Sequence, residues 1–107
     1  MMDMLFMLFV WHALADYPLQ GDFLAKAKNE TAPIPGVPWW QAMLAHSLTH
    51  AGGVLLITGS TYMAMLELVF HYWIDRAKCT GKIGFNGDQS LHVLCKAAYV
   101  VTLAITA

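Results

Sequence analysis

The chain has 107 residues; 58% are hydrophobic, only 12% are charged, and the net charge is −1. A soluble domain carries roughly 25% charged residues, and a core this small cannot hide so much apolar surface from water. The composition therefore argues against a soluble domain, favours lipid as the surrounding medium, and predicts a single domain over residues 1–107. We expect no nucleic-acid partner, and the two cysteines, which form no CxxC pair, do not indicate a disulfide framework.

The first predicted helix covers residues 2–17, which are almost all Met, Leu, Phe and Val until His12 and Asp16. It ends at Pro18, because proline lacks the backbone N–H that a continuing helix needs. Residues 22–28 are predicted to form a short amphipathic helix at the membrane surface, with Asp22 as its N-cap. Three prolines and a glycine predict a loop over residues 29–38.

Three further helices are predicted after this loop. The second long helix covers residues 38–58 and begins with Pro38 and paired tryptophans, which suit the headgroup interface. Residues 59–61 leave room only for a tight turn, so the third long helix, residues 61–78, must be antiparallel to the second. A loop over residues 81–87 precedes the fourth, which Asp88 or Ser90 opens and which continues to the C-terminus. The predicted fold class is all-α, a compact four-helix transmembrane bundle whose helices are short against the roughly 20 residues that span a bilayer.

The basic residues are distributed unevenly among the predicted loops. If four helices span, the loops after the first and third helices share one side. These regions hold five of the six lysines and arginines, whereas the hairpin between the second and third helices holds none. By the positive-inside rule, both loops face the cytoplasm. We therefore predict a multi-pass integral protein of the bacterial inner membrane, with membrane lipids as partners.

Every histidine belongs to a pair spaced four residues apart, the spacing that places two side chains on one face of a helix. The pairs are His12 with Asp16, His46 with His50, Glu67 with His71, His71 with Asp75, and Asp88 with His92. The predicted topology puts them all at a similar depth, in the cytoplasmic half of the bundle. Ionisable groups inside membrane helices cost about 2.5–3.5 kcal/mol each on insertion scales, so we interpret them as functional.

These pairs predict a divalent metal site. Neutral imidazoles and carboxylates ligate Zn²⁺, the most favoured ion here, and also suit Mn²⁺ or Fe²⁺, whereas haem suits the carboxylates less well. The candidate ligands are His12, Asp16, His46, His50, His71, Asp75, Asp88 and His92. They exceed the four ligands of one closed zinc site, so either two metals bind or several carboxylates orient the histidines. Glu67 is a further candidate for either part. A stripe of small residues, Ala45, Thr49 and Gly53, lies beside the His46/His50 face and permits close approach of another helix.

The chain resembles a family of small bacterial and phage membrane proteins, domain-of-unknown-function family 3307, in the segments HALADYPLQGDFLAKAKN, HSLTHA, HYWIDRAK and DQSLH. The resemblance implies a compact multi-pass membrane protein but no particular activity. It also implies a polar signature consisting of His12, Asp16, Gln20, Asp22, His46, His50, His71, Asp75, Asp88, Gln89 and His92.

More loosely, the HxxxD pairs are similar to those of membrane-bound metal-dependent hydrolases and of zinc-dependent helical enzymes of the phospholipase C type. Segment 49–52, Thr-His-Ala-Gly, is similar to a motif of the membrane hydrolases. The chain departs from the soluble zinc enzymes in size, because it lacks their additional helices. Transfer of phosphoesterase chemistry therefore rests on analogy.

The leading hypothesis is a metal-dependent hydrolase of a phosphoester or lipid at the cytoplasmic leaflet. A bound divalent metal lowers the pKa of a water ligand towards about 7 and so supplies hydroxide at neutral pH. Asp16, Asp22 or Asp75 would act as general base, because each is expected near the mouth of the site. The anionic phosphoester would be held by lysines, for which the candidates are Lys26, Lys28, Lys78, Lys82 and Lys96. Pairing with Glu67 is the alternative role of Lys96.

Two other functions stay open. The same polar core would serve a proton or metal-ion transporter or channel subunit, which four short helices would form only as a homo-oligomer. Alternatively, the chain is a structural or interaction protein of phage or bacterial origin, and the metal only holds a small bundle together.

Overall fold

The computed structural model describes residues 1–107 as five α-helices with no strand, which confirms the predicted all-α class. The helices are α1 (Met2–Asp16), α2 (Gly21–Ala27), α3 (Trp39–Thr58), α4 (Thr61–Cys79) and α5 (Phe85–Thr106). Two predicted starts were wrong. α5 begins before Asp88, whose carboxylate lies in the first turn and faces the positive end of the helix dipole. α2 begins at Gly21, and Asp22 lies within its first turn instead of capping it.

The predicted antiparallel hairpin is formed by α3 and α4. α3 ends at Thr58 and is followed by Gly59, whose φ of 69° is a left-handed conformation that glycine adopts without strain. Ser60 then caps α4, because its Oγ accepts a hydrogen bond of 3.2 Å from the backbone N–H of Met63. One glycine and one serine are therefore enough to reverse the chain.

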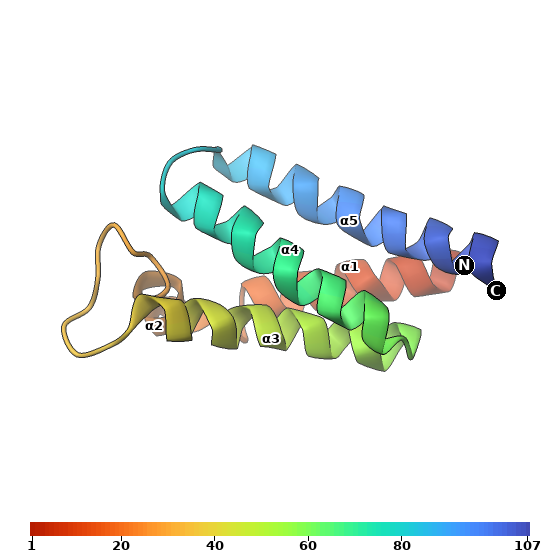
Figure 1. The fold of residues 1–107 in the computed structure, drawn as a ribbon, viewed down its shortest axis with the longest axis horizontal. Coiled ribbons are helices and arrows are strands. Elements are labelled where there is room, and N and C mark those ends of the chain that lie inside the picture. Colours follow the sequence, from red (N-terminus) through yellow and green to blue (C-terminus); the bar gives the residue numbers. More distant parts are fainter.

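The four long helices run side by side (Figure 1), with α1 packed on α3 and α5, and α4 packed on α3 and α5. Both termini and the α3–α4 turn lie at one end of the bundle. α2, the long loop after it and the α4–α5 connection lie at the other end, so the basic residues predicted to share one side do share one end. The small-residue stripe brings α1 close to α3, because the Trp11 ring lies against Gly53 and its Nε1 donates to the Thr49 carbonyl at 3.1 Å.

The interior of the bundle is unusually polar and its exterior is apolar. Ten of the 22 buried residues are polar or charged, which is far more than a water-soluble core contains. The apolar core is a small cluster near the end that holds the termini, formed by Leu8, Val54, Met63, Tyr99 and Val100. Large apolar side chains cover the outside instead, among them Leu56, Met65, Leu94, Val101 and Ile105.

By length and composition, α5 is the one helix that could cross a membrane. α1, with only 15 residues, is too short to be a candidate span. α3, which carries His46 and His50, and α4, which carries four charged side chains, are not apolar enough. Helix composition therefore does not support a four-helix transmembrane bundle, and it identifies one candidate span.

Candidate metal centre

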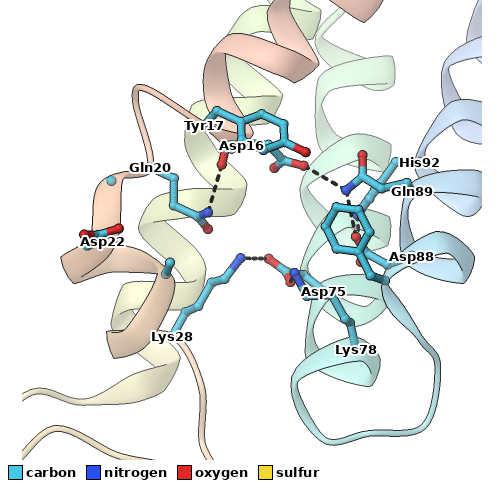
Figure 2. Close-up of a pocket in the computed structure, with 13 residues that line it drawn as sticks. Asp16, Tyr17, Gln20, Asp22, Lys28, Asp75, Lys78, Asp88, Gln89 and His92 are labelled. Carbon is cyan, nitrogen blue, oxygen red and sulfur yellow. Dashed lines mark hydrogen bonds and ion pairs between the residues drawn. The ribbon is translucent and has the colours of Figure 1, made fainter.

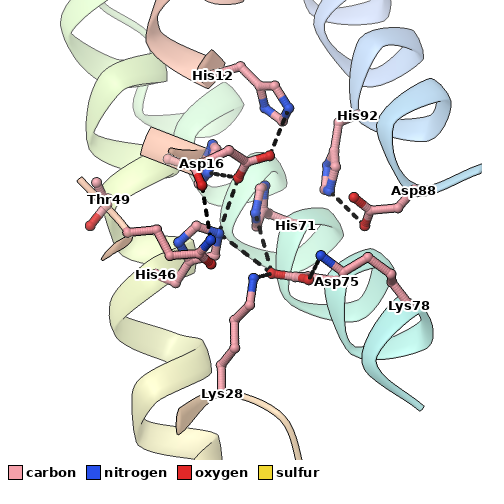
Figure 3. Close-up of polar contacts among 12 residues, drawn as sticks. His12, Asp16, Lys28, His46, Thr49, His71, Asp75, Lys78, Asp88 and His92 are labelled. Carbon is pink, nitrogen blue, oxygen red and sulfur yellow. Dashed lines mark hydrogen bonds and ion pairs between the residues drawn. The ribbon is translucent and has the colours of Figure 1, made fainter. Parts of the chain in front are cut away.

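All five histidine rings meet inside the bundle, although they come from four helices (Figure 3). The ring centroids of His50 and His71 are 3.7 Å apart, those of His71 and His92 are 4.1 Å apart, and those of His46 and His50 are 4.8 Å apart. His12 joins from α1 with its centroid 5.1 Å from that of His50. The four-residue spacing has turned each pair inward, so the candidate ligands share one depth.

Three of these histidines and Asp16 form one group, the four-donor group: Asp16, His46, His50 and His71, whose ligand atoms all lie within 4.8 Å of one another. The Asp16 Oδ1 atom is 2.8 Å from His50 Nε2 and 3.3 Å from His46 Nε2. Bonds of about 2.0–2.2 Å in a tetrahedral zinc site place ligand atoms about 3.4 Å apart. One carboxylate and three imidazoles with donor atoms within 4.8 Å of one another could hold a divalent metal once the side chains adjust to this spacing.

All three imidazoles in the four-donor group have unpaired nitrogens. His46 Nδ1, His46 Nε2, His50 Nδ1 and His71 Nε2 are buried without a hydrogen bond of normal geometry, although His46 Nε2 lies 3.3 Å from Asp16 Oδ1. A buried polar atom left in this state costs about 1–3 kcal/mol, and each such atom needs an explanation. A metal ion at the centre of the group would satisfy the Nε2 atoms.

Asp75 lies beside the group and is held by two lysines. Its Oδ2 is 3.5 Å from His46 Nε2 and 4.0 Å from His71 Nε2, and the same oxygen accepts a hydrogen bond from the Lys28 ammonium. Its Oδ1 lies 3.2 Å from Lys78 Nζ. Lys28 and Asp75 are almost completely buried, whereas Lys78 is partly exposed. The two lysines therefore balance the negative charge of Asp75 at the edge of the four-donor group.

An outer ring of side chains connects α1 to the start of α5. His12 Nε2 lies 3.0 Å from Gln89 Oε1, and Gln89 Nε2 donates to Asp16 Oδ2 at 3.1 Å and to Asp88 Oδ2 at 3.0 Å. His92 Nε2 lies 3.2 Å from Asp88 Oδ1. Gln89 was absent from the ligand prediction, because an uncharged amide adds nothing to a pattern of histidines and carboxylates. Four predicted ligands thus lie outside the four-donor group, namely His12, Asp75, Asp88 and His92.

Glu67 lies one helical turn deeper and contacts His71 from the other side. Its Oε1 accepts hydrogen bonds from His71 Nδ1 at 3.2 Å and from Lys96 Nζ at 2.6 Å, and its Oε2 accepts one from Tyr99 Oη at 2.8 Å. Lys96 is only 2% exposed and does not line the pocket. Of the two roles predicted for Lys96, these contacts favour pairing with Glu67 over binding a substrate.

A pocket of about 280 Å³ opens beside the metal group at the end of the bundle that carries the basic loops (Figure 2). Its charged lining residues are Asp16, Asp22, Lys28, Asp75, Lys78 and Asp88. Lys26, predicted as a substrate ligand, is exposed and does not line it, and neither does Lys82. Lys28 directly follows α2 and continues its helical backbone, and two positions along a helix rotate a side chain by about 200°. Lys26, in the last turn of α2, therefore faces the side opposite to Lys28. Four carboxylates and two ammonium groups give the pocket lining a net negative charge, so it attracts cations more strongly than anions.

The loop after α2 is bound to α4 at the end of the bundle where the pocket opens. Arg76 Nε donates to Glu30 Oε1 at 2.6 Å, and the guanidinium lies 5.3 Å from the Trp39 ring and 5.2 Å from the Trp73 ring. The hydrogen bond from Arg76 lowers the pKa of the Glu30 carboxyl from its ordinary value of 4.5. Arg76 thus uses two tryptophans and a loop glutamate to anchor the segment that carries the chain back into α3.

Comparison with known proteins yields a family but no characterised relative. No curated protein and no solved structure matches the chain, so the looser similarity to metal-dependent hydrolases gains no support. A family model does match nearly the whole length, and the matched residues include all five histidines described above. The chain belongs to the family described as "Protein of unknown function (DUF3307)", whose model matches residues 4–107.

Proposed function

We propose that the protein is a membrane-embedded, divalent-metal-dependent hydrolase of a phosphoester or lipid, with Zn²⁺ as the preferred ion and Mn²⁺ or Fe²⁺ as substitutes. The observation that carries this proposal is the convergence of one carboxylate and three imidazoles from three helices, with ligand atoms within 4.8 Å of one another. Buried histidine nitrogens without partners support it, because metal binding supplies the interaction that they lack.

The pocket beside this group supports hydrolysis over mere storage of a metal. Asp16 is the member of the four-donor group that lines the pocket, so water and substrate would approach from its side. A Zn²⁺ ion held by these residues would lower the pKa of a bound water to about 7, and catalytic zinc sites sometimes accept a fifth ligand. Asp75, within 4.0 Å of two of the imidazoles, is placed to accept a proton from such a water. Lys28 and Lys78 are the lysines that line the pocket, and a phosphoester would compete with Asp75 for them.

The apolar exterior supports a location in the membrane. α3, α4 and α5 have 20, 19 and 22 residues and are therefore about 28–33 Å long, close to the thickness of the hydrocarbon layer. α1 is shorter and would need local thinning of the bilayer. Five of the six basic residues gather at the end where the pocket opens. We infer a multi-pass arrangement in the bacterial inner membrane with the pocket facing the cytoplasm.

Metal content tests the proposal directly. We expect detergent-purified protein to carry about one zinc ion per chain by elemental analysis, and His46→Ala and His71→Ala to abolish it. Gln41→Ala is the control, because this exposed residue is on the same helix as His46 but lies outside the four-donor group, and it should retain the metal. Zinc-loaded protein should hydrolyse a chromogenic phosphomonoester or phosphatidic acid in vesicles. Protein that lacks stoichiometric metal, or variants that keep it unchanged, would exclude the proposed site.

One observation also favours the structural alternative: four protein donors are the number found in closed, structural zinc sites. In that case chelation should unfold the bundle, and the zinc-loaded protein should hydrolyse no phosphoester. The transport alternative gains less support. The polar interior ends at Glu67 and Tyr99, and beyond them the apolar cluster of Leu8, Val54 and Met63 closes the bundle.

A further inference from the structure

One helical turn deeper in the bundle than His71, a buried ionic cluster joins α4 to α5. Its three members, Glu67, Lys96 and Tyr99, are 1%, 2% and 3% exposed, and none lines the pocket. Lys96 and Tyr99 donate to different oxygens of the Glu67 carboxylate, at 2.6 and 2.8 Å. Burying an ion pair is expensive, and apolar residues of similar volume are often equally stable or more so. Stability alone therefore gives little reason for the cluster, and it cannot contact a ligand in the pocket.

His71 connects this cluster to the metal centre. Its Nδ1 lies 3.2 Å from the Glu67 oxygen that Lys96 also contacts. An ammonium only donates, so the carboxylate is the acceptor and Nδ1 must be the protonated nitrogen of the ring. A neutral imidazole carries one such proton, which leaves the Nε2 lone pair free. This Nε2 atom is buried and has no hydrogen-bond partner.

The alternative role for Glu67 is as a ligand itself, because Glu67, His71 and His92 also offer atoms within 4.8 Å of one another. Both oxygens of the carboxylate are already engaged, however, by an ammonium and a phenol. A cation placed there would displace Lys96 and leave its charge buried without a partner, which is strongly destabilising. The contacts therefore favour an orienting role over a second metal.

We propose that Glu67, held in place by Lys96 and Tyr99, is a positioning residue that fixes the tautomer of His71 so that Nε2 faces the metal. This inference rests on the proposed metal site. Metal-binding histidines commonly donate their second N–H to a carboxylate, which sets ring orientation and tautomer, and loss of that partner typically weakens metal binding about 10–100-fold.

The tautomer can be measured without any metal. In metal-free, ¹⁵N-labelled wild-type protein in detergent micelles, the ring nitrogen shifts of His71 should report protonated Nδ1 and unprotonated Nε2. Protonated Nε2 at His71 would overturn the proposal. Because this measurement needs neither a metal nor a variant, it separates failure of the Glu67 inference from failure of the proposed function.

A paired variant tests the consequence for the metal. Replacing both charges together, Glu67→Leu with Lys96→Leu, removes the acceptor without stranding a buried charge, and Zn²⁺ affinity measured by chelator competition should fall about 10–100-fold. Glu67→Gln combined with Lys96→Leu keeps an acceptor oxygen, again without stranding a buried charge, and should retain the tautomer and most of the affinity. Unchanged affinity and tautomer in the double variant would show a purely structural cluster. If the double variant does not fold, the His71 tautomer, measured in the wild type and in Tyr99→Phe, decides whether Glu67 orients this ring.

Discussion

The carboxylate of Asp16 and the imidazole of His50 lie 2.8 Å apart, Oδ1 to Nε2, although 34 residues separate them in the chain. Asp16 is the last residue of α1, and His50 is in the middle of α3. This contact closes the four-donor group on the side of the pocket. It therefore makes Asp16 the residue whose loss should affect metal binding and chemistry together.

Asp16→Ala should weaken Zn²⁺ binding by more than about 100-fold, the upper range for loss of an outer partner, because a direct ligand is removed. The measurement is competition with a chromogenic chelator in detergent solution. Asp3→Asn is the matched control, because Asp3 is on the same helix, exposed and far along the chain from the centre. Equal affinities in the two variants would remove Asp16 from the ligand set.

Lys28→Met should destabilise the protein by about 3–5 kcal/mol, because it leaves the buried Asp75 carboxylate without its partner on Oδ2. Lys26→Met, two residues away on the exposed side of α2, should change stability by less than about 0.5 kcal/mol. Chemical unfolding followed by circular dichroism compares the two. Similar stabilities would mean that Lys78 alone neutralises Asp75.

Two adjacent glycines in α3 should respond oppositely to alanine. A Cβ on Gly53 would lie 2.0 Å from the Trp11 ring, so Gly53→Ala should cost about 1–3 kcal/mol by forcing α1 away from α3. A Cβ on Gly52 meets nothing within 4 Å, so Gly52→Ala should stabilise the helix by up to about 1 kcal/mol. Thermal unfolding measures both, and destabilisation of equal size would contradict the packing of Trp11.

Leu94→Lys tests whether α5 lies in lipid. The side chain is 63% exposed near the middle of the helix, and a lysine there should cost about 2.5–3.5 kcal/mol in membrane insertion. Ile105→Lys, at the end of the same helix and 77% exposed, should be tolerated because a terminal lysine reaches the interface. Membrane fractionation of the tagged proteins gives the result. Wild-type protein found free in the soluble fraction would contradict the proposed location.

The anchor of the loop after α2 should release in acid. Because Arg76 lowers the pKa of Glu30 in the folded protein, the stabilisation is fully present above pH 4.5 and is lost as the pH falls through the folded value. Hydrogen-exchange protection of the backbone amides in residues 31–37 should therefore drop below pH 4.5 in the wild type. Glu30→Gln should lack this transition; a transition that persists would assign it to another group.

The periodicity of the chain was sufficient to predict most of the candidate site. Residues four apart share a helix face whatever surrounds them, so His46 and His50, or His71 and Asp75, could be paired from the sequence alone. The hairpin of α3 and α4 followed in the same way from a three-residue connection. These features are local, because hydrogen bonds within one helix and the chemistry of one turn determine them.

Contacts between helices were not predictable in this way. The sequence left Lys96 with two roles, and only the packing of α5 on α4 brought its ammonium to Glu67. Lys26 and Lys28 are equally basic, yet the orientation of α2 over the pocket selected Lys28. Such choices depend on the relative rotation of two helices, which no spacing along a single helix contains.

By itself, the sequence determined an all-α chain with an apolar exterior, histidines and carboxylates on single helix faces, and basic residues confined to two loops. Only the tertiary structure decided which of the eight predicted ligands meet: Asp16, His46, His50 and His71 form one group, and the others surround it. The physical reason is that helical periodicity sets the direction of each side chain, whereas the packing of α1, α3 and α4 sets the distances on which coordination depends.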